Sequence, residues 1–141
     1  MNSKNTTFLT KVFKFCAAHQ YGNDKWSDEK NWEVFGKDTQ VHGHNYTLHV
    51  TVTGDINPDS GFLVDLGHLK KIVKKNVVDI LDHSQFEKDI PWFKGKQPST
   101  EVLVVFIWEE ITKDLEGCKL HRIRIEETPT IYTDYYGPSN D

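Results

Sequence analysis

The chain has 141 residues and a formal net charge of −4. This length suits a single domain, residues 1–141, that buries its core without disulfides. The negative charge and the lack of a basic run argue against nucleic-acid binding. The two cysteines, Cys16 and Cys118, do not make a disulfide framework, and no apolar run approaches membrane-spanning length. We therefore expect a cytoplasmic protein that does not enter the membrane.

The first two predicted elements are β-strands. Residues 8–19 and residues 42–53 each alternate apolar with polar side chains, the pattern of a half-buried strand. Between them, residues 20–40 form a polar excursion that holds a short helix starting near Ser27. A turn-rich loop, residues 55–61, follows the second strand.

Two helices are predicted after this loop. Apolar residues recur at helical spacing from about residue 65 to residue 81. The predicted apolar positions of this first helix are Leu66, Leu69, Val73, Val77, Ile80 and Leu81. Ser99 or Thr100 is the N-cap of a second helix, whose apolar face reaches Leu115 and which ends at Gly117.

Two further strands, residues 120–127 and 131–136, close the chain. The order ββααββ predicts an α+β fold with a four-stranded, mostly antiparallel sheet and two helices on one face. Such a small open sheet has two exposed edges, so we expect copies of the chain to associate.

Three histidines are predicted to meet at one rim of this sheet. His42 and His44 lie two apart and project from the same face as the apolar residues that follow them. His19 ends the apolar face of the first strand, so antiparallel pairing places it beside the other two. Three imidazoles with an open fourth position are typical of a catalytic zinc site. The alternative is that the His-x-His pair is only surface or hydrogen-bonded decoration.

Further candidates follow the first helix and end the third strand. Asp82 and His83 are adjacent and could form a proton relay, or His83 could simply complement the helix C-terminal dipole. Glu127 shares the parity of Ile123 and Ile125, which indicates a carboxylate on the inward face or at a solvated strand end. A buried acid needs a partner, and a ligand with N–H donors is one.

Six short blocks occur in a fixed order along residues 8–136. The blocks are Phe15–His19, Val41–Tyr46, Gly61–Leu66, Leu81–His83, Pro98–Glu101 and Glu127–Pro129. Together they resemble the 6-pyruvoyl-tetrahydropterin synthase family, which includes the 6-carboxy-tetrahydropterin synthases of queuosine biosynthesis. The resemblance implies the tunnelling fold (T-fold), in which trimers close a barrel of strands, two trimers stack as a homohexamer, and active sites lie between subunits.

The resemblance also implies a zinc-dependent lyase. His19, His42 and His44 match the zinc ligands, and Asp82 with His83 matches a pair that reaches the catalytic centre of a neighbouring subunit. The implied substrate is 7,8-dihydroneopterin triphosphate. Zinc binds its side-chain hydroxyls and acidifies the adjacent C–H bonds, which permits proton shifts and loss of triphosphate.

The implied pterin pocket contains one departure from the family pattern. Glu127 matches the acid that holds the pterin's N–H groups, and Thr100 and Glu101 lie in a block that lines the pocket. Asp38 stands where many members carry the catalytic cysteine, four residues before His42. An unperturbed aspartate has a pKa about 4.6 units below that of cysteine, so it is the weaker base. From the residues alone, Asp38 is a base, a partner of an imidazole, a fourth ligand or a turn residue.

Three functions are consistent with these features. The first is the zinc-dependent lyase on a dihydropterin side chain. Its variant, in a related subgroup with glutamate at the position of Asp38, cleaves the side chain to 6-hydroxymethyl-dihydropterin for folate synthesis. The second is a non-catalytic pterin- or purine-binding protein. The third is a cupin, because Gly36-x5-His42-x-His44 fits the start of that motif, although two long helices do not belong in an all-β barrel.

Overall fold

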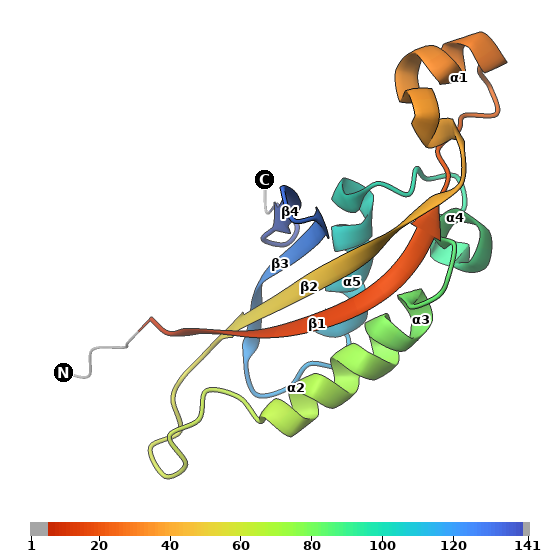
Figure 1. Ribbon diagram of the computed structural model, residues 1–141. Coiled ribbons are helices and arrows are strands. Elements are labelled where there is room, and N and C mark those ends of the chain that lie inside the picture. The colour runs from red at the N-terminus through yellow and green to blue at the C-terminus, as the bar shows by residue number, and fades with distance from the viewer. Residues whose placement is uncertain (1–5, 140–141) are drawn as a thin grey trace.

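A four-stranded antiparallel sheet forms the centre of the computed structural model, which describes residues 6–139 (Figure 1). Its strands are β1 (Phe8–His19), β2 (His42–Thr53), β3 (Lys119–Thr128) and β4 (Ile131–Tyr135). They lie in the order β1-β2-β3-β4, and each neighbouring pair is antiparallel. The predicted α+β class and the predicted sheet are confirmed. The helices exclude the all-β cupin fold.

Two long helical segments cover one face of the sheet (Figure 1). The first runs without a break through α2 (Leu66–Val73), the π-helical turn η2 (Lys74–Val78) and α3 (Asp79–Leu81). The second is α5 (Thr100–Thr112). The apolar sides of both segments meet the inward side chains of β2 and β3, which are fully buried, and this layer is the hydrophobic core. The predicted placement of two helices on one face is confirmed.

The first helical segment buries a narrower face than the sequence predicts. Four of its six predicted apolar positions have no exposed surface, but Leu66 and Ile80 are 49% and 42% exposed. Leu66 is the first helical residue, before the segment reaches the core. Ile80 follows the η2 turn, where i→i+5 hydrogen bonding changes the register of the apolar face. Asn76 occupies part of the buried face, and its amide donates to the Glu110 carbonyl at 2.9 Å.

The second helix begins as predicted and ends early. Ser99 is its N-cap, and the Ser99 hydroxyl accepts a hydrogen bond from the Val102 N–H at 3.3 Å. The helix ends at Thr112, so the predicted end at Gly117 is five residues too late, and Leu115 packs against the core from the segment that follows. Gly117 has a positive φ of 83°, so the chain reverses there as its glycine indicates.

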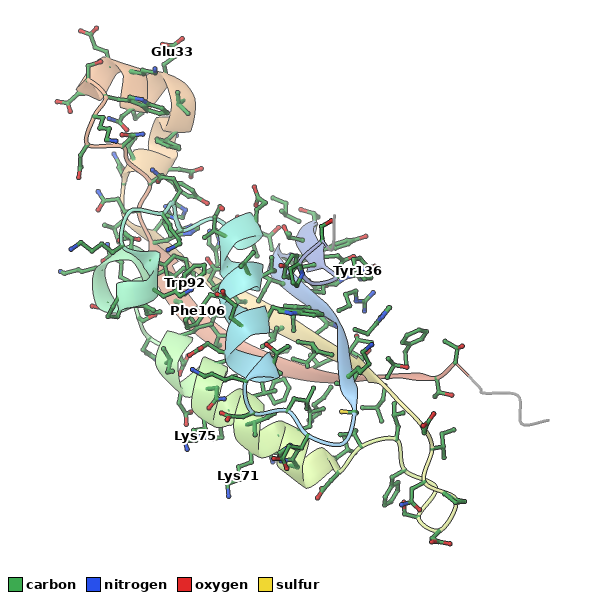
Figure 2. All side chains as sticks on the ribbon, turned by 180° about the vertical axis from the view of Figure 1, so that it is seen from behind. Glu33, Lys71, Lys75, Trp92, Phe106 and Tyr136 are labelled. Carbon is green, nitrogen blue, oxygen red and sulfur yellow. The ribbon has the colours of Figure 1, made fainter. Side chains whose placement is uncertain are left out.

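Two short helices between the long ones were not predicted. They are α4 (Phe86–Asp89) and the 3-10 turn η3 (Pro91–Phe93). Phe86 and Phe93 are buried and stack with ring centroids 5.5 Å apart. Trp92 packs on Phe106 of α5 at 5.4 Å, and Figure 2 shows these two rings side by side. Elements of three or four residues are too short to show a helical period, which is why the sequence pattern missed them.

The excursion between β1 and β2 holds α1 (Asp28–Phe35) and the 3-10 turn η1 (Gly36–Thr39), and it stands away from the body (Figure 1). Ser27 is the N-cap of α1, as predicted, and α1 has no buried residue. The two ends of the excursion lie side by side, because the Tyr21 N–H donates a hydrogen bond to the Asp38 carbonyl at 3.0 Å. This closure brings the side chains of Tyr21 and Asp38 to the rim where β1 ends and β2 begins.

No helix within residues 6–139 combines the length and the apolar character that crossing a bilayer requires.

Candidate metal centre

The pairing of β1 with β2 brings the three predicted histidines together. His19 lies directly opposite His42, and Ala17 lies opposite His44. Gly43 permits this close pairing, since a Cβ at that position would lie 2.9 Å from the Ala17 carbonyl oxygen. The glycine of the His-Gly-His motif therefore sets the spacing of the imidazoles.

The ligand nitrogens of His19, His42 and His44 all lie within 4.8 Å of one another. The Nδ1–H of His19 donates to the Pro98 carbonyl at 2.8 Å, and that of His42 donates to the Gln40 carbonyl at 2.9 Å. Because carbonyls only accept hydrogen bonds, these contacts leave both Nε2 lone pairs facing the centre. The two Nε2 atoms are 2.9 Å apart, a separation at which lone pairs repel unless a cation or proton lies between them.

The donor set fits a metal ion. The Nε2 atom of His44 is buried and has no hydrogen-bond partner within the described residues, so a cation would satisfy it. Burial lowers the pKa of His19, and the neighbouring His42 lowers it further, against the opposing effect of the Pro98 carbonyl. The neutral imidazole that results is the form that binds metals.

Asp38 lies beside this centre. One of its carboxylate oxygens is 3.6 Å from His42 Nε2, and the side chain is 59% exposed. This distance is longer than a hydrogen bond. The carboxylate thus belongs to the 3-10 turn η1 and is exposed beside the histidine cluster, where it can meet a ligand.

Glu127 approaches the centre from β3. It occupies a bulge between Glu126 and Thr128 in the pairing of β3 with β4. Its Oε1 is 3.7 Å from His44 Nε2, and its side chain is 20% exposed. Its carboxylate therefore lies next to the imidazole cluster, near the end of β3 and still partly exposed, so each of the two predicted positions describes it in part.

Thr100 and Glu101 begin α5 near the same rim. Thr100 is buried, and its hydroxyl donates to Glu101 Oε1 at 2.8 Å. The same hydroxyl lies 2.8 Å from the hydroxyl of Thr133 on β4, which fixes the start of α5 against the sheet.

Tyr21 is a member of this site that the sequence reasoning missed. Burial raises the pKa of its phenol, and the charges of Glu127, Glu101 and Asp38 raise it further. Carboxylates from three segments of the chain therefore act electrostatically on this one phenol. The Tyr21 ring also contacts the ring of His19, with centroids 5.0 Å apart.

Tyr46 is a second missed member. Its position in the alternating pattern of β2 predicted only a core residue, and the structure buries it to 1% exposure. However, its hydroxyl has no hydrogen-bond partner within the described residues. Burial raises the pKa of this phenol, and the charge of Glu127 adds to the effect. Phenylalanine would pack equally well at this position, so the presence of a tyrosine was the signal in the sequence that its hydroxyl has a role.

Asp82 and His83 follow α3 as predicted, and they pair with each other and with the backbone of β1. The Nδ1 of His83 is 2.8 Å from Asp82 Oδ2, and Asp82 Oδ1 accepts the Cys16 N–H at 2.9 Å. The Cys16 N–H, and then the His83 imidazole, lower the pKa of Asp82. The His83 side chain is 81% exposed. No hydrogen bond or ion pair among residues 6–139 joins this pair to the metal centre of the same chain.

The fold and the site together define an α+β protein with a cluster of three histidines, able to hold a metal ion, at the rim of an antiparallel sheet. Over residues 8–138 the sequence matches the family model described as 6-pyruvoyl tetrahydropterin synthase. The chain belongs to this family. The predicted resemblance is confirmed, and with it the T-fold.

Relatives cover almost the whole chain. A 6-pyruvoyl tetrahydrobiopterin synthase of Dictyostelium discoideum is 37% identical over 94% of this chain and 97% of its own length. The 6-pyruvoyl tetrahydropterin synthase structure of Caenorhabditis elegans superposes with a TM-score of 0.90 at 33% identity, over 98% of this chain and 100% of the other. A 6-carboxy-5,6,7,8-tetrahydropterin synthase of Bacillus subtilis is 37% identical over 73% of each chain.

Proposed function

We propose that this chain is a zinc-dependent lyase that acts on the side chain of a dihydropterin, with 7,8-dihydroneopterin triphosphate as the first candidate substrate. The observation that carries the proposal is the convergence of three imidazole Nε2 atoms beside the carboxylate of Glu127. The relatives named above are synthases of tetrahydropterins, which supports the same class of substrate. The proposed unit is one pterin-synthase-like domain over residues 1–141.

Zinc is the proposed metal because three neutral imidazoles and an open position are its usual catalytic ligand set. His19, His42 and His44 hold it in this proposal, and the Pro98 and Gln40 carbonyls orient two of the rings. When bound, zinc acts as a Lewis acid on the hydroxyls of the substrate side chain and acidifies the neighbouring C–H bonds.

The surrounding side chains are assigned by what each can accept or donate. Glu127 accepts the N–H groups of the pterin ring, and Thr100 and Glu101 line the same pocket. Asp38 is the proposed base of its own subunit, because its carboxylate stands next to a metal ligand on the open side of the centre.

The exposed pair of Asp82 and His83 serves a neighbouring subunit in this proposal. Such shared sites require an oligomer, and a trimer or homohexamer fits the exposed edge strands β1 and β4. Phe8 and Val12 of β1, and Ile131 of β4, are large apolar residues left exposed on those edges. We place the protein in the cytoplasm, since Cys16 and Cys118 are free thiols.

A second candidate reaction is cleavage of the side chain to 6-hydroxymethyl-dihydropterin for folate synthesis. The Asp38 carboxylate beside the histidines favours this reaction. A carboxylate is a much weaker base than the thiolate that the synthase reaction uses. The two reactions share the metal centre and the pterin pocket, so they differ only in the product.

Mass spectrometry of the products tests the proposal and separates these outcomes. Zinc-loaded protein is incubated with 7,8-dihydroneopterin and, separately, with its triphosphate. A 6-pyruvoyl product formed with loss of triphosphate, or a 6-carboxy product formed with loss of triphosphate and a two-carbon fragment, supports the synthase. A 6-hydroxymethyl product with release of the other two side-chain carbons supports side-chain cleavage. Tight binding measured by calorimetry with no product after long incubation would instead make the chain a non-catalytic pterin- or purine-binding protein.

A further inference from the structure

The buried phenol of Tyr46 has a fixed position and an unsatisfied hydroxyl. Its ring stacks on Phe15 with centroids 5.2 Å apart and an interplanar angle of 17°, and it also packs on Phe86 at 5.6 Å. Both neighbours are themselves buried. Because a hydroxyl at the para position cannot move unless the ring moves, it cannot swing to another partner. Within the described residues it makes no hydrogen bond.

The strand register places this hydroxyl on the side of Glu127. Leu48 pairs with Ile125, and Thr47 pairs with Glu126 at the end of this ladder, and Tyr46 and Glu127 are the next residues along the two strands. The Tyr46 ring also lies 5.6 Å from that of His44, which Glu127 approaches. A hydroxyl donor and a carboxylate acceptor therefore occupy facing positions of adjacent strands at the metal centre.

The Glu127 carboxylate is free to accept this hydrogen bond. Its Oε1 lies 3.7 Å from His44 Nε2, which is beyond hydrogen-bond distance, and within residues 6–139 its side chain accepts no hydrogen bond. A buried hydroxyl without a partner lowers stability relative to phenylalanine in the same packing. Tyr46 therefore costs the folded chain stability, and occupation of the pocket is the state in which the hydroxyl can be satisfied.

We propose that Tyr46 is a positioning residue for Glu127: its hydroxyl donates to one carboxylate oxygen while the carboxylate binds adjacent N–H groups of a flat heterocycle. This inference rests on the proposed pterin function. An ionised carboxylate has about four lone-pair sites, enough for two ligand N–H groups and the phenol together. The hydrogen bond holds the plane of the carboxylate in line with the ligand, which reduces the ordering cost of binding.

The test is Tyr46→Phe, which removes only the hydroxyl. Without pterin, its melting temperature is expected to equal or exceed that of the wild type in a thermal unfolding scan. Its Kd for 7,8-dihydroneopterin by calorimetry is expected to rise about tenfold, the usual size for a lost hydrogen bond to a charged group. In turnover, KM rises while kcat stays within about twofold, and bound zinc is unchanged. Tyr135→Phe is the control, because it removes the hydroxyl of a tyrosine whose ring packs on Trp108 of α5, and its Kd is expected to match the wild type.

Three results would overturn the inference. A wild-type Kd in Tyr46→Phe removes the link to Glu127 while leaving the pterin function in place, because the wild type still binds. A lowered melting temperature shows that the hydroxyl makes a structural hydrogen bond in the free protein. If the wild type binds no dihydropterin at all, the proposed function fails, and this inference fails with it.

Discussion

Asp38 is the single residue on which the choice of reaction depends. Its carboxylate stands 3.6 Å from a ligand nitrogen and is largely exposed, so it reaches a bound substrate without belonging to the core. We expect Asp38→Asn to lower kcat by about 10²–10⁴-fold, the usual contribution of a positioned base, with the pterin Kd unchanged. Steady-state kinetics and calorimetry on the same preparation measure both. Unchanged turnover would remove Asp38 from the mechanism, and loss of zinc would make it a metal ligand.

The three histidines give a second residue-level prediction. His44→Ala removes a ligand itself, so the zinc Kd is expected to rise by more than the roughly 10–100-fold that loss of a hydrogen-bond partner of a ligand costs. Metal analysis after dialysis measures this. His49→Ala is the matched control, because His49 lies on the same strand but faces Glu126 on the other side of the sheet. Equal zinc loss in both variants would count against the site.

Side-chain parity was enough to predict the imidazole cluster, and it failed for the groups around it. His19, His42 and His44 follow from alternation along two paired strands. The Pro98 and Gln40 carbonyls that orient the rings come from irregular backbone, whose direction no residue pattern encodes. Tyr46 was missed because a tyrosine in an apolar pattern looks like a core residue, and Tyr21 was missed because it lies in the polar excursion of residues 20–40, where no pattern indicates its neighbours.

Two serine caps give a matched test at the level of elements. The Ser99 hydroxyl caps α5, whose apolar face is buried in the core, and the Ser27 hydroxyl caps α1, which buries nothing. We expect Ser99→Ala to lower the free energy of unfolding by about 1 kcal/mol. Ser27→Ala removes a similar bond at 3.1 Å, but α1 frays without unfolding the body, so global stability should stay within about 0.5 kcal/mol. Urea unfolding measures both, and an equal loss would show that α1 is integral to the folded core.

The ion pair that joins β3 to β4 makes stability depend on pH. Arg124 donates from Nε and Nη2 to the two carboxylate oxygens of Asp134, at 2.6 and 2.9 Å. These hydrogen bonds lower the pKa of Asp134. The pair is mostly shielded from solvent and bidentate, so Asp134→Asn should lower the free energy of unfolding by about 1 kcal/mol at pH 7.

The direction of the pH effect follows from the lowered pKa. The stabilisation is complete above the ordinary aspartate pKa of about 3.9 and disappears as the pH falls through the lowered value. Urea titrations should therefore show a difference in the free energy of unfolding between the wild type and Asp134→Asn at pH 7, and this difference should vanish below about pH 3. Asp79→Asn is the control, because its pair with Lys74 is mostly exposed and should matter little at either pH. If Asp134→Asn has the same free energy of unfolding as the wild type at pH 7, the prediction is contradicted.

Elements were predictable in proportion to their length and regularity. β1 and β2 each run for twelve residues of clean alternation, and their observed bounds match the predicted ones. The π turn at Lys74–Val78 and the short helices of residues 86–93 depend on which side chains meet across the core, so no local period shows them. The bulge at Glu127 is a similar case, since it appears only when β3 pairs with β4.

At the scale of the whole molecule, one chain does not assemble all the groups that the proposed reaction uses. The metal centre lies at the rim between β1 and β2, whereas the Asp82–His83 pair points into solvent from the turn after α3. The positive φ of His83, 62°, belongs to that turn and holds the imidazole outward. An exposed relay and an incomplete centre on the same chain are complementary, so a neighbouring copy supplies each with its counterpart in the proposed assembly.

Mixed oligomers test this arrangement. Asp38→Asn removes the base of its own centre, and His83→Ala removes the relay that a neighbour needs, so each pure variant is expected to be nearly inactive. When equal amounts are unfolded together and refolded, random assembly gives about a quarter of the centres both intact halves, and about a quarter of wild-type activity should return. A mixture of Asp38→Asn with His42→Ala is the control. In the proposed centre Asp38 and His42 come from the same chain, so no chain in this mixture carries both residues intact and no activity should return. No recovery in the first mixture would contradict the shared site, because Asp38 and His83 would then have to act within one chain. Recovery in the control would show instead that Asp38 and His42 of different chains meet in one centre.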